Sequence, residues 1–410
     1  MQVLDRFLRY VTVDTQSDPA SPTQPSTEKQ LDLGRILLDE LISIGLTDAE
    51  LDRNGYVYAT LPATPGHESA PVICFCSHMD TSPDASGTDV KPIVHHNYSG
   101  EDIVLPLGNR VVIRADEFPG LRDNIGQTII TASGDTLLGA DNKSGIAAIM
   151  AAVEYLREHP AIPHGKLRIL FTPDEEIGRG VDAVDMEKLG ADFGYTIDGE
   201  TRGSLEDETF SADAATITVQ GVSAHPGFAK DKLENAVKIA ADIIAALPRK
   251  GLSPETTEGR EGFLHPVSMT AKAESARLDF ILRDFATANL KDHAELLQSI
   301  VDEVARRYPN SSIQLTTKEQ YRNMREVVDQ HPRVTDLATR AIRAVGLSPR
   351  RSHIRGGTDG SRLSFVGLPC PNIFAGEHAF HSPYEWASLY EMEKAAEVIV
   401  EISRLNTELA

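Results

Sequence analysis

Short apolar runs alternate along the first half of the chain with longer segments in which apolar residues recur at helical spacing. Residues 70–76, 166–171 and 193–197 predict buried strands, and residues 28–44 and 145–159 predict helices. Strands and helices in alternation favour a mostly parallel sheet covered by helices, so we expect an α/β fold. In such a sheet, ligands bind where the strands end at their carboxyl edge.

The pattern of apolar positions changes after about residue 208. Residues 214–219 and 276–282 alternate apolar and polar positions, as antiparallel strands do, and residues 233–247 and 286–307 predict helices. A change of this kind is typical of a separate domain. We therefore predict an α+β lid domain inserted into a catalytic domain, with the lid at residues 209–320 and the catalytic domain at residues 1–208 and 321–410.

Composition and charge narrow the possible partners. The chain has 410 residues, of which 41% are hydrophobic and 25% charged, as is ordinary for a globular protein. Its formal charge of −21 disfavours nucleic acid and membrane surfaces as partners, because their phosphates would be repelled. The N-terminal segment is broken by charges, and no run approaches the ~20 apolar residues that span a bilayer. We expect a cytoplasmic protein and leave a homodimer open.

The three cysteines also favour a cytoplasmic protein. Cys74 and Cys76 share one face of a predicted strand, and Cys370 is remote from them in sequence. Reduced thiols in a cytoplasmic protein are the simplest interpretation. A zinc site at Cys74 and Cys76 is disfavoured, because no second pair of cysteines follows.

Metal-binding residue types stand where several predicted strands end. They are His78, Asp141, Glu176, Asp198 and His381, with Asp80 and Glu175 beside the first and third of them. Two imidazoles with several carboxylates are the ligands that a two-metal hydrolase needs. Because His78 and Asp80 are two residues apart in extended chain, their side chains project the same way, and Asp80 can orient the His78 ring. Such ligands suit Zn²⁺, with Mn²⁺ or Co²⁺ as substitutes.

Each position also has an ordinary structural interpretation. Asp141 stands where a strand gives way to a helix, so it fits a helix N-cap as well as a carboxylate that bridges two cations. Glu175 and Glu176 follow an apolar run and would ordinarily belong to a solvated loop. His378 competes with His381 for the role of the late histidine. The recurrence of acids at successive strand ends is what favours a metal site.

Several longer motifs resemble those of the dinuclear zinc exopeptidases, the family that includes tripeptide aminopeptidases, aminoacylases and glutamate carboxypeptidases. The resemblance runs almost end to end, and it is carried by V-D-T-Q-S, F-C-S-H-M-D-T-S-P-D, T-L-L-G-A-D, F-T-P-D-E-E and I-R-G-G-T-D-G-S-R-L-S-F-V-G-L-P-C-P-N. The last motif is specific to the tripeptide aminopeptidases. The resemblance therefore implies a metal-dependent aminopeptidase that releases the N-terminal residue from short peptides, tripeptides foremost.

The resemblance also implies two zinc ions per subunit. His78 and Asp198 would hold one ion, and Glu176 and His381 would hold the other. Asp141 would bridge the two ions. A water shared by the two ions would then attack the peptide bond.

Catalytic roles follow from the same resemblance. Glu175 would deprotonate the attacking water and pass the proton to the leaving amine, while Asp80 supports His78. His225, in G-V-S-A-H-P-G on the lid, resembles the family histidine that stabilises the oxyanion; its alternative interpretation is a turn residue before proline. The positions that match substrate contacts are Arg283, Arg355 and Asn235. Because a guanidinium pairs bidentately with a carboxylate, we expect Arg355 to bind the C-terminus of the peptide.

The chain departs from the tripeptide aminopeptidases at a few positions near the expected site. Those enzymes usually read A-D-D-K, where this chain has A-D-N-K with Asn142. Glu200 and Glu377 are additional acids, and we expect one of them to meet the α-ammonium of the substrate, with harmless surface charge as the alternative. These departures bear on substrate preference more than on reaction type.

Two other functions remain compatible with the sequence. The first is a dipeptidase or an N-acyl amino acid deacylase on the same fold. The second is a catalytically silent protein that binds metal or peptides. A silent protein could dispense with Glu175 and Asp80, yet both are present.

Overall fold

The chain forms two compact units in the computed structural model, which describes residues 2–108 and 110–409. Unit 1 takes the described residues within 1–207, 324–353 and 358–410. Unit 2 takes Glu208–Asn323 and Ile354–Gly357. The short return of residues 354–357 to unit 2 has no counterpart in the division expected from sequence.

Unit 1 is built on an eight-stranded sheet in the order β1-β2-β8-β3-β9-β16-β10-β15. The strands are β1 (Glu50–Leu51), β2 (Val57–Leu61), β8 (Leu167–Thr172), β3 (Ile73–His78), β9 (Phe193–Gly199), β16 (Asn372–Phe374), β10 (Ser204–Thr209) and β15 (Arg350–Ile354). The four central strands β8, β3, β9 and β16 are parallel, whereas β1, β2 and β10 run antiparallel to their partners. The predicted α/β fold is confirmed, with parallel pairing confined to the centre of the sheet.

Central strand β3 shows why the sequence forms this sheet. All its residues are buried, and Ile73 and Phe75 join the large apolar cluster on one face. Cys74 and Cys76 alternate with them and join a second cluster on the other face, which also contains Cys370. A strand covered on both faces must be apolar throughout, which explains its continuous apolar run. All three cysteines are free thiols.

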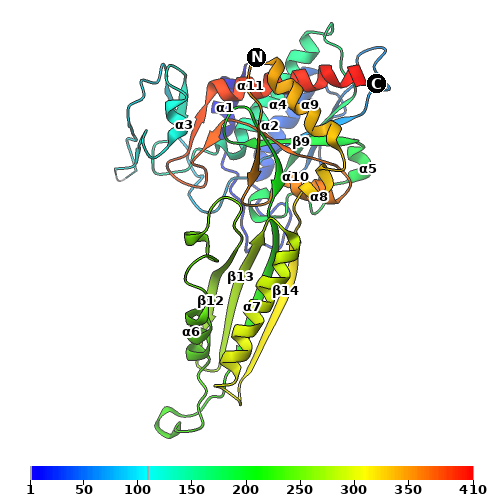
Figure 1. Ribbon diagram of the computed structural model, residues 1–410. Helices are drawn as coiled ribbons and strands as arrows, with labels where there is room; N and C mark the ends of the chain where they lie inside the picture. The colour runs from blue at the N-terminus through cyan, green and yellow to red at the C-terminus, as the bar shows by residue number, and fades with distance from the viewer. Residues whose placement is uncertain (1, 109, 410) are drawn as a thin grey trace. The chain divides into compact units, whose positions relative to one another are not determined.

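Helices cover both faces of this sheet. The large cluster is formed with α1 (Val3–Val11), α2 (Gln30–Ile44), α4 (Ala140–Glu158), α9 (Pro332–Ala344) and α11 (Leu389–Asn406). Among these helices, α11 lies beside both α4 and α9 (Figure 1). The opposite face carries the short helices α5 (Met186–Leu189) and α10 (Asp359–Phe365). Helix α4 is buried almost all round, which suits its alanine-rich sequence.

A smaller sheet in unit 1 joins two segments that are far apart in sequence. Its order is β17-β18-β7-β4, with β17 (Glu377–His378), β18 (Trp386–Ser388), β7 (Ile129–Thr131) and β4 (Ile93–His95). Between β4 and β7 in the sequence, β5 (Ile103–Val104) pairs with β6 (Val112–Ile113), and α3 (Pro119–Arg122) follows. Residues 81–133 thus carry short strands, and one of them, β7, pairs with β18 at the end of the loop that contains His381.

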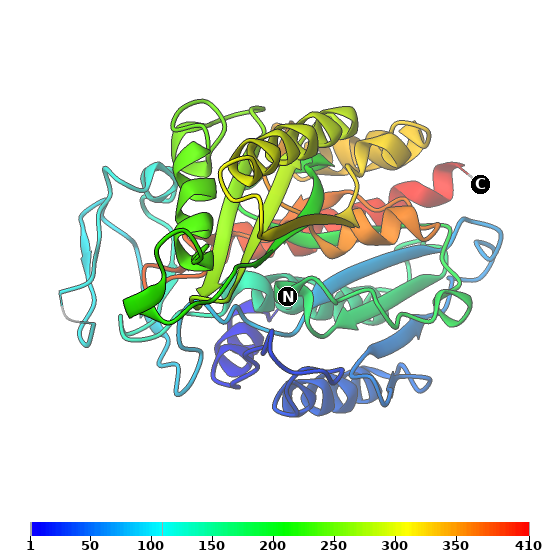
Figure 2. The same ribbon diagram turned by 90° about the horizontal axis from the view of Figure 1, so that it is seen from below.

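Unit 2 is a four-stranded antiparallel sheet in the order β12-β13-β11-β14. Its strands are β12 (Phe263–Ala271), β13 (Ser275–Asp284), β11 (Ser211–Gln220) and β14 (Ser312–Tyr321). Helices α6 (Ala236–Ala246) and α7 (Thr287–Ala305) share one apolar cluster with these strands, and Figure 2 shows both helices on the same face of the sheet. Strand β12 was not predicted, because it is an edge strand with Pro266 at an irregular register and four exposed residues in a row at 267–270.

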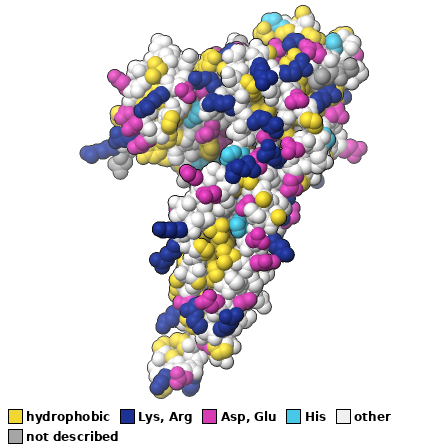
Figure 3. Space-filling view, in the orientation of Figure 1, with side chains coloured by type: hydrophobic (Ala, Val, Ile, Leu, Met, Phe, Trp, Pro, Cys, Tyr) yellow, Lys and Arg dark blue, Asp and Glu magenta, His cyan; other side chains and the backbone are white. Residues whose placement is uncertain are grey.

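The visible surface carries charges of both signs. Figure 3 shows Lys and Arg side chains interspersed with Asp and Glu over that face. Among the residues that the structure describes, no helix has the length and apolar composition to cross a membrane.

Gly145 on α4 provides a test of this packing. A Cβ atom at Gly145 would lie 1.9 Å from the Ile197 carbonyl oxygen and 2.5 Å from Ser77 Oγ, so the helix approaches β9 closely only because the side chain is absent. We expect Gly145→Ala to lower the free energy of unfolding by about 1–3 kcal/mol, as overpacking does. Urea unfolding would measure the change. Gly356→Ala is the control, because its Cβ would meet nothing closer than 3.8 Å. Equal stability of the two variants would contradict this account.

Candidate metal centre

The parallel strands of unit 1 bring acidic and imidazole side chains to one edge of the sheet. Strand β3 ends at His78, and Asp198 is the second-last residue of β9. Strand β8 ends at Thr172, shortly before the turn that carries Glu175 and Glu176. Because parallel strands end at the same edge, these side chains lie together although they are distant in sequence.

Asp141 lies between two histidines. Its Oδ1 atom is 2.9 Å from His78 Nε2, and its Oδ2 atom is 3.3 Å from His381 Nε2. The remaining acids pair off with one histidine each. Asp198 Oδ1 is 3.5 Å from His78 Nε2, and Glu176 Oε2 is 2.7 Å from His381 Nε2. One carboxylate thus faces two ligand groups, His78–Asp198 and Glu176–His381.

These groups have the composition and spacing of metal sites. Candidate ligand atoms of His78, Asp141 and Asp198 lie within 4.8 Å of one another, and so do those of Asp141, Glu176 and His381. Glu176 Oε1 and Asp198 Oδ1 are buried and accept no hydrogen bond from any described residue. A buried carboxylate oxygen without a partner is costly, and a cation at each group would satisfy both atoms. The donor set therefore fits two metal ions.

The electrostatics of the cluster point to the same need for positive charge. Burial, and then the neighbouring Asp141, raise the pKa of Glu176 to about 8. Burial also raises the pKa of Glu175 well above its usual range. The carboxylates of Asp198, Asp141 and Asp80 raise the pKa of His78 despite its burial. The folded chain thus favours bound protons or bound cations at this place.

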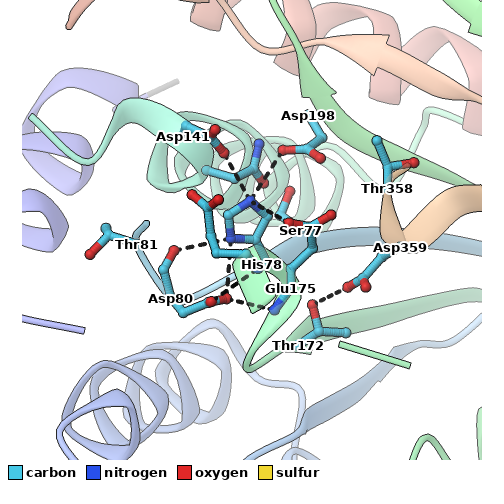
Figure 4. Close-up of polar contacts among 12 residues, drawn as sticks. Ser77, His78, Asp80, Thr81, Asp141, Thr172, Glu175, Asp198, Thr358 and Asp359 are labelled. Atoms are coloured by element: carbon cyan, nitrogen blue, oxygen red, sulfur yellow. Dashed lines mark hydrogen bonds and ion pairs between the residues drawn. The ribbon is translucent and has the colours of Figure 1, made fainter. Parts of the chain in front are cut away.

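Asp80 supports two parts of the cluster at once. Its Oδ1 atom is 3.3 Å from His78 Nδ1, on the side of the ring opposite to Asp141 and Asp198 (Figure 4). The same carboxylate accepts hydrogen bonds from the backbone N–H groups of Glu175 and Glu176 at 3.0 and 3.2 Å. Asp80 is completely buried. It therefore fixes the His78 ring relative to the turn that carries both glutamates.

Asp174 anchors the same turn from the other side, and the sequence analysis did not single it out. Its buried carboxylate accepts hydrogen bonds from the Ser26 backbone N–H, the Ser26 hydroxyl and the Gln30 side-chain amide. Its own N–H donates to Gln30 Oε1. Asp174 has a left-handed φ of 59°, so these contacts hold an uncommon backbone conformation. The signal in sequence was only a third acid in P-D-E-E.

Glu385 is a second residue that the sequence analysis missed. Its carboxylate is buried and accepts hydrogen bonds from the backbone N–H groups of Leu138, Gly139 and Asp141, at 2.6, 2.8 and 3.0 Å. Gly139 is the N-cap of α4, and Asp141 makes no capping hydrogen bond and has non-helical dihedral angles. The N-cap interpretation of Asp141 is therefore wrong, and its carboxylate is free to face the histidines.

The loop after β17 decides between the two late histidines. His378 is buried, donates from Nε2 to Glu391 Oε2 at 2.7 Å, and stacks on Trp386 with ring centroids 3.9 Å apart. His381 instead lies with Asp141 and Glu176. His381 is therefore the histidine of the cluster, and His378 belongs to the packing around Trp386.

The two additional acids lie in different surroundings. Glu377 is buried and accepts hydrogen bonds from Asn142 Nδ2 at 3.2 Å and Ser144 Oγ at 2.9 Å. Burial, and then Asp141, raise the pKa of Glu377 well above its usual range, which is a poor property for binding an ammonium group. Glu200 is exposed. The expectation that one of these acids meets a substrate ammonium gains no support at Glu377.

The lid candidates all lie in unit 2. His225 is exposed, and its Nδ1 accepts a hydrogen bond from the Gly227 N–H at 3.2 Å. Asn235 is the N-cap of α6 and accepts from the Val237 N–H. Arg355 donates to the carbonyl oxygens of Gly259 and Glu261 and to Thr257 Oγ1.

Arg283 has a different environment within unit 2. It donates to the Arg355 carbonyl oxygen at 3.3 Å, and its guanidinium lies over the rings of Phe263 and Tyr321. Its Nε atom is buried and has no hydrogen-bond partner among the described residues. Arg283 therefore keeps more unused hydrogen-bonding capacity than Arg355.

Comparison with known proteins identifies the family. The model described as peptidase family M20/M25/M40 matches residues 137–404. A relative from Halothermothrix orenii is 48% identical over 98% of this chain and 98% of its own length, and one from Bacillus velezensis is 48% identical over 100% and 99%. The chain belongs to peptidase family M20/M25/M40. Both of these relatives are named Peptidase T.

Solved structures in this family have the same fold. An aminopeptidase PepT from Bacillus cereus matches with a TM-score of 0.74 at 22% identity, over 99% of this chain and 98% of that one. A tripeptidase from Staphylococcus aureus matches with a TM-score of 0.77 at 22% identity, with the same coverage. The M20/M25/M40 fold thus extends over the whole chain, lid included.

The buried acids predict how stability depends on pH when metal is withheld. Desolvation raises the pKa of Glu206, beside Asp198, to about 8, and burial raises that of Glu385 to about 7. An acid whose pKa is raised by folding contributes stability below its unfolded pKa and loses it as pH rises through the folded value. In a chelating buffer, the free energy of unfolding should therefore fall between about pH 4.5 and 8.

Thermal unfolding at several pH values, with chelator or with Zn²⁺, would measure this dependence. Zn²⁺ should offset part of the loss, because it binds the ionised ligand carboxylates of the folded protein, which are other groups than Glu206 and Glu385. Glu206→Gln should flatten the curve in chelator, whereas exposed Glu28→Gln serves as the control and should not. A metal-free protein that gains stability over the same range would contradict the expectation.

Proposed function

We propose that the chain is a zinc-dependent aminopeptidase that releases the N-terminal residue from tripeptides. The observation that carries this proposal is the Asp141 carboxylate, with one oxygen facing His78 and the other facing His381. The near full-length relatives named Peptidase T support the choice of reaction. Short peptides are the proposed partners, in the cytoplasm, and a homodimer stays a proposal as well.

His78 and Asp198 would hold one zinc ion, Glu176 and His381 the other, and Asp141 both. When bound, the two ions supply an activated water and polarise the substrate carbonyl. Nitrogen and carboxylate ligands of this kind suit Zn²⁺, with Mn²⁺ or Co²⁺ as substitutes. Every other step depends on residues of the chain itself.

Glu175 is the proposed general base. Its Oε2 atom is 3.8 Å from His78 Nε2, and its backbone N–H is held by Asp80. A carboxylate in this place can take a proton from the attacking water and then give it to the leaving amine. Asp80 would act by holding the His78 ring and the turn that carries Glu175.

His225 is the proposed oxyanion donor. Because its Nδ1 accepts the Gly227 N–H, neutral His225 carries its proton on Nε2. An exposed Nε2–H is the donor that a developing negative charge on the substrate carbonyl requires.

Arg283, Arg355 and Asn235 are the proposed substrate contacts. Three donor contacts of Arg355 are already taken by residues 257–261, and Asn235 uses its side-chain oxygen as an N-cap. Arg283 Nε has no hydrogen-bond partner among the described residues, so Arg283 is the better candidate for binding the peptide carboxylate.

Replacing the base gives the sharpest test of the mechanism. We expect Glu175→Gln to lower kcat for a tripeptide by about 10²–10⁴-fold, because proton transfer to and from the carboxylate is lost. Two equivalents of zinc should remain bound, as measured by mass spectrometry of the metal content. Glu187→Gln, on exposed helix α5, is a matched control and should keep full activity. Turnover close to that of the unaltered protein would rule Glu175 out as the base.

A substrate comparison separates the proposed activity from the alternatives. Tripeptides, dipeptides and N-acetyl amino acids should be assayed side by side at equal concentration. We expect tripeptides to have the highest kcat/KM and blocking of the N-terminus by acetylation to abolish cleavage. Preference for dipeptides or for acetylated substrates would favour a dipeptidase or a deacylase. Two bound metals without hydrolysis of any short peptide would favour a silent binding protein.

A further inference from the structure

His381 has a carboxylate on the ring nitrogen that faces away from the cluster. Asp84 Oδ2 lies 3.2 Å from His381 Nδ1, while His381 Nε2 faces Glu176 and Asp141. We infer that Asp84 is a positioning residue that orients His381 for metal binding. This inference rests on the proposed dinuclear site.

The two metal-site histidines are supported in the same way from one short segment. Asp80 lies on Nδ1 of His78, and Asp84, four residues later in H-M-D-T-S-P-D, lies on Nδ1 of His381. At His78, Nδ1–H can donate to the backbone carbonyl oxygen of Asp80 at 3.0 Å, with the Asp80 carboxylate at 3.3 Å, and at His381 the Asp84 carboxylate is the acceptor in reach. A proton on Nδ1 leaves the Nε2 lone pair of each ring for a metal. The carboxylate also makes the imidazole a more basic ligand.

His381 needs such support more than His78 does. The His78 side chain is 2% exposed and is fixed by packing, whereas that of His381 is 37% exposed. His381 also has a left-handed φ of 59°, on a loop where Ala379 has φ 53°. A ring on an exposed loop with this backbone conformation has little packing to fix its direction. The contact with Asp84 therefore fixes the direction of the His381 ring, which packing does not fix.

The loop that carries Asp84 is itself held in place, although the Asp84 side chain is 67% exposed. The side-chain amide of Gln16 donates to the carbonyl oxygens of Ser82 and Ala85, at 3.0 and 2.8 Å. These two carbonyls flank Asp84, so one amide fixes the backbone on both sides of it. Gln16 also pairs with Thr81 through a β-bridge. The position of Asp84 is thus built into the fold.

A metal-binding experiment tests the inference without reference to catalysis. Zinc affinity would be measured for each of the two equivalents, by competition with a chromogenic chelator, in the unaltered protein and in Asp84→Asn. Loss of a carboxylate behind a metal-bound histidine typically weakens binding 10–100-fold. Because Asp84 is exposed, we expect about a tenfold weaker affinity for one equivalent and no change for the other. Asp84→Glu should restore part of the loss.

Double variants assign the weakened equivalent to a site. Asp84→Asn should add little to Glu176→Gln, because both act on the His381 side. On an Asp198→Asn background, which affects the His78 side, it should retain its full effect. Asp89→Asn is the control, since Asp89 is exposed and forms an ion pair with exposed Lys91. Urea unfolding in chelator should be the same for Asp84→Asn and the unaltered protein.

The outcomes separate this inference from the proposed function. If the unaltered protein binds two zinc ions and cleaves tripeptides while Asp84→Asn binds both ions with unchanged affinity, only the role of Asp84 is refuted. Lower stability of Asp84→Asn in chelator would also refute it, because the effect would then be structural. If the unaltered protein itself fails to bind two zinc ions, the proposed function fails.

Discussion

The crowding of carboxylates at the carboxyl edge of the central sheet is the constraint on which the site depends. Glu175, Glu176 and Asp198 meet Asp141 in a largely buried space, where like charges repel strongly. Two buried carboxylate oxygens of this cluster also accept no hydrogen bond from the part of the chain that the structure describes. Two divalent cations would neutralise the cluster and satisfy those atoms. The architecture of the edge is thus organised for metal before any substrate is considered.

The fold holds these groups in place mainly by carboxylates that accept backbone N–H groups. Asp80 binds the Glu175–Glu176 turn, Asp174 ties the same turn to the N-terminal segment, and Glu385 holds the backbone that leads into Asp141. A carboxylate that accepts two or three N–H groups fixes the direction of a loop more firmly than one contact between side chains. Loops, which are the mobile parts of most folds, become rigid enough here to place metal ligands.

Much of this could be predicted from the sequence, because strand ends and acids are both visible in it. The apolar runs and their positions predicted the α/β fold and the insertion of a second unit into the first. The same runs predicted that His78, Asp141 and Asp198 lie together. Glu385 and Asp174 were missed, because a residue that accepts backbone N–H groups leaves no pattern of side-chain types. The choice between His378 and His381 needed the loop after β17, whose left-handed residues no periodicity indicates. The position of that loop depends on tertiary structure, which local sequence patterns do not encode.

The departures at Asn142 and Glu377 explain each other once the structure is considered. An acid at position 142 would put a second carboxyl group within hydrogen-bond distance of Glu377, in a buried space where two negative charges would repel. In this chain Asn142 donates its amide to Glu377 at 3.2 Å and to the Ile197 carbonyl at 2.7 Å. The neutral amide at 142 therefore permits the acid at 377. The two departures are thus in direct contact, and the Asn142 amide joins the Glu377 carboxyl group to the end of β9.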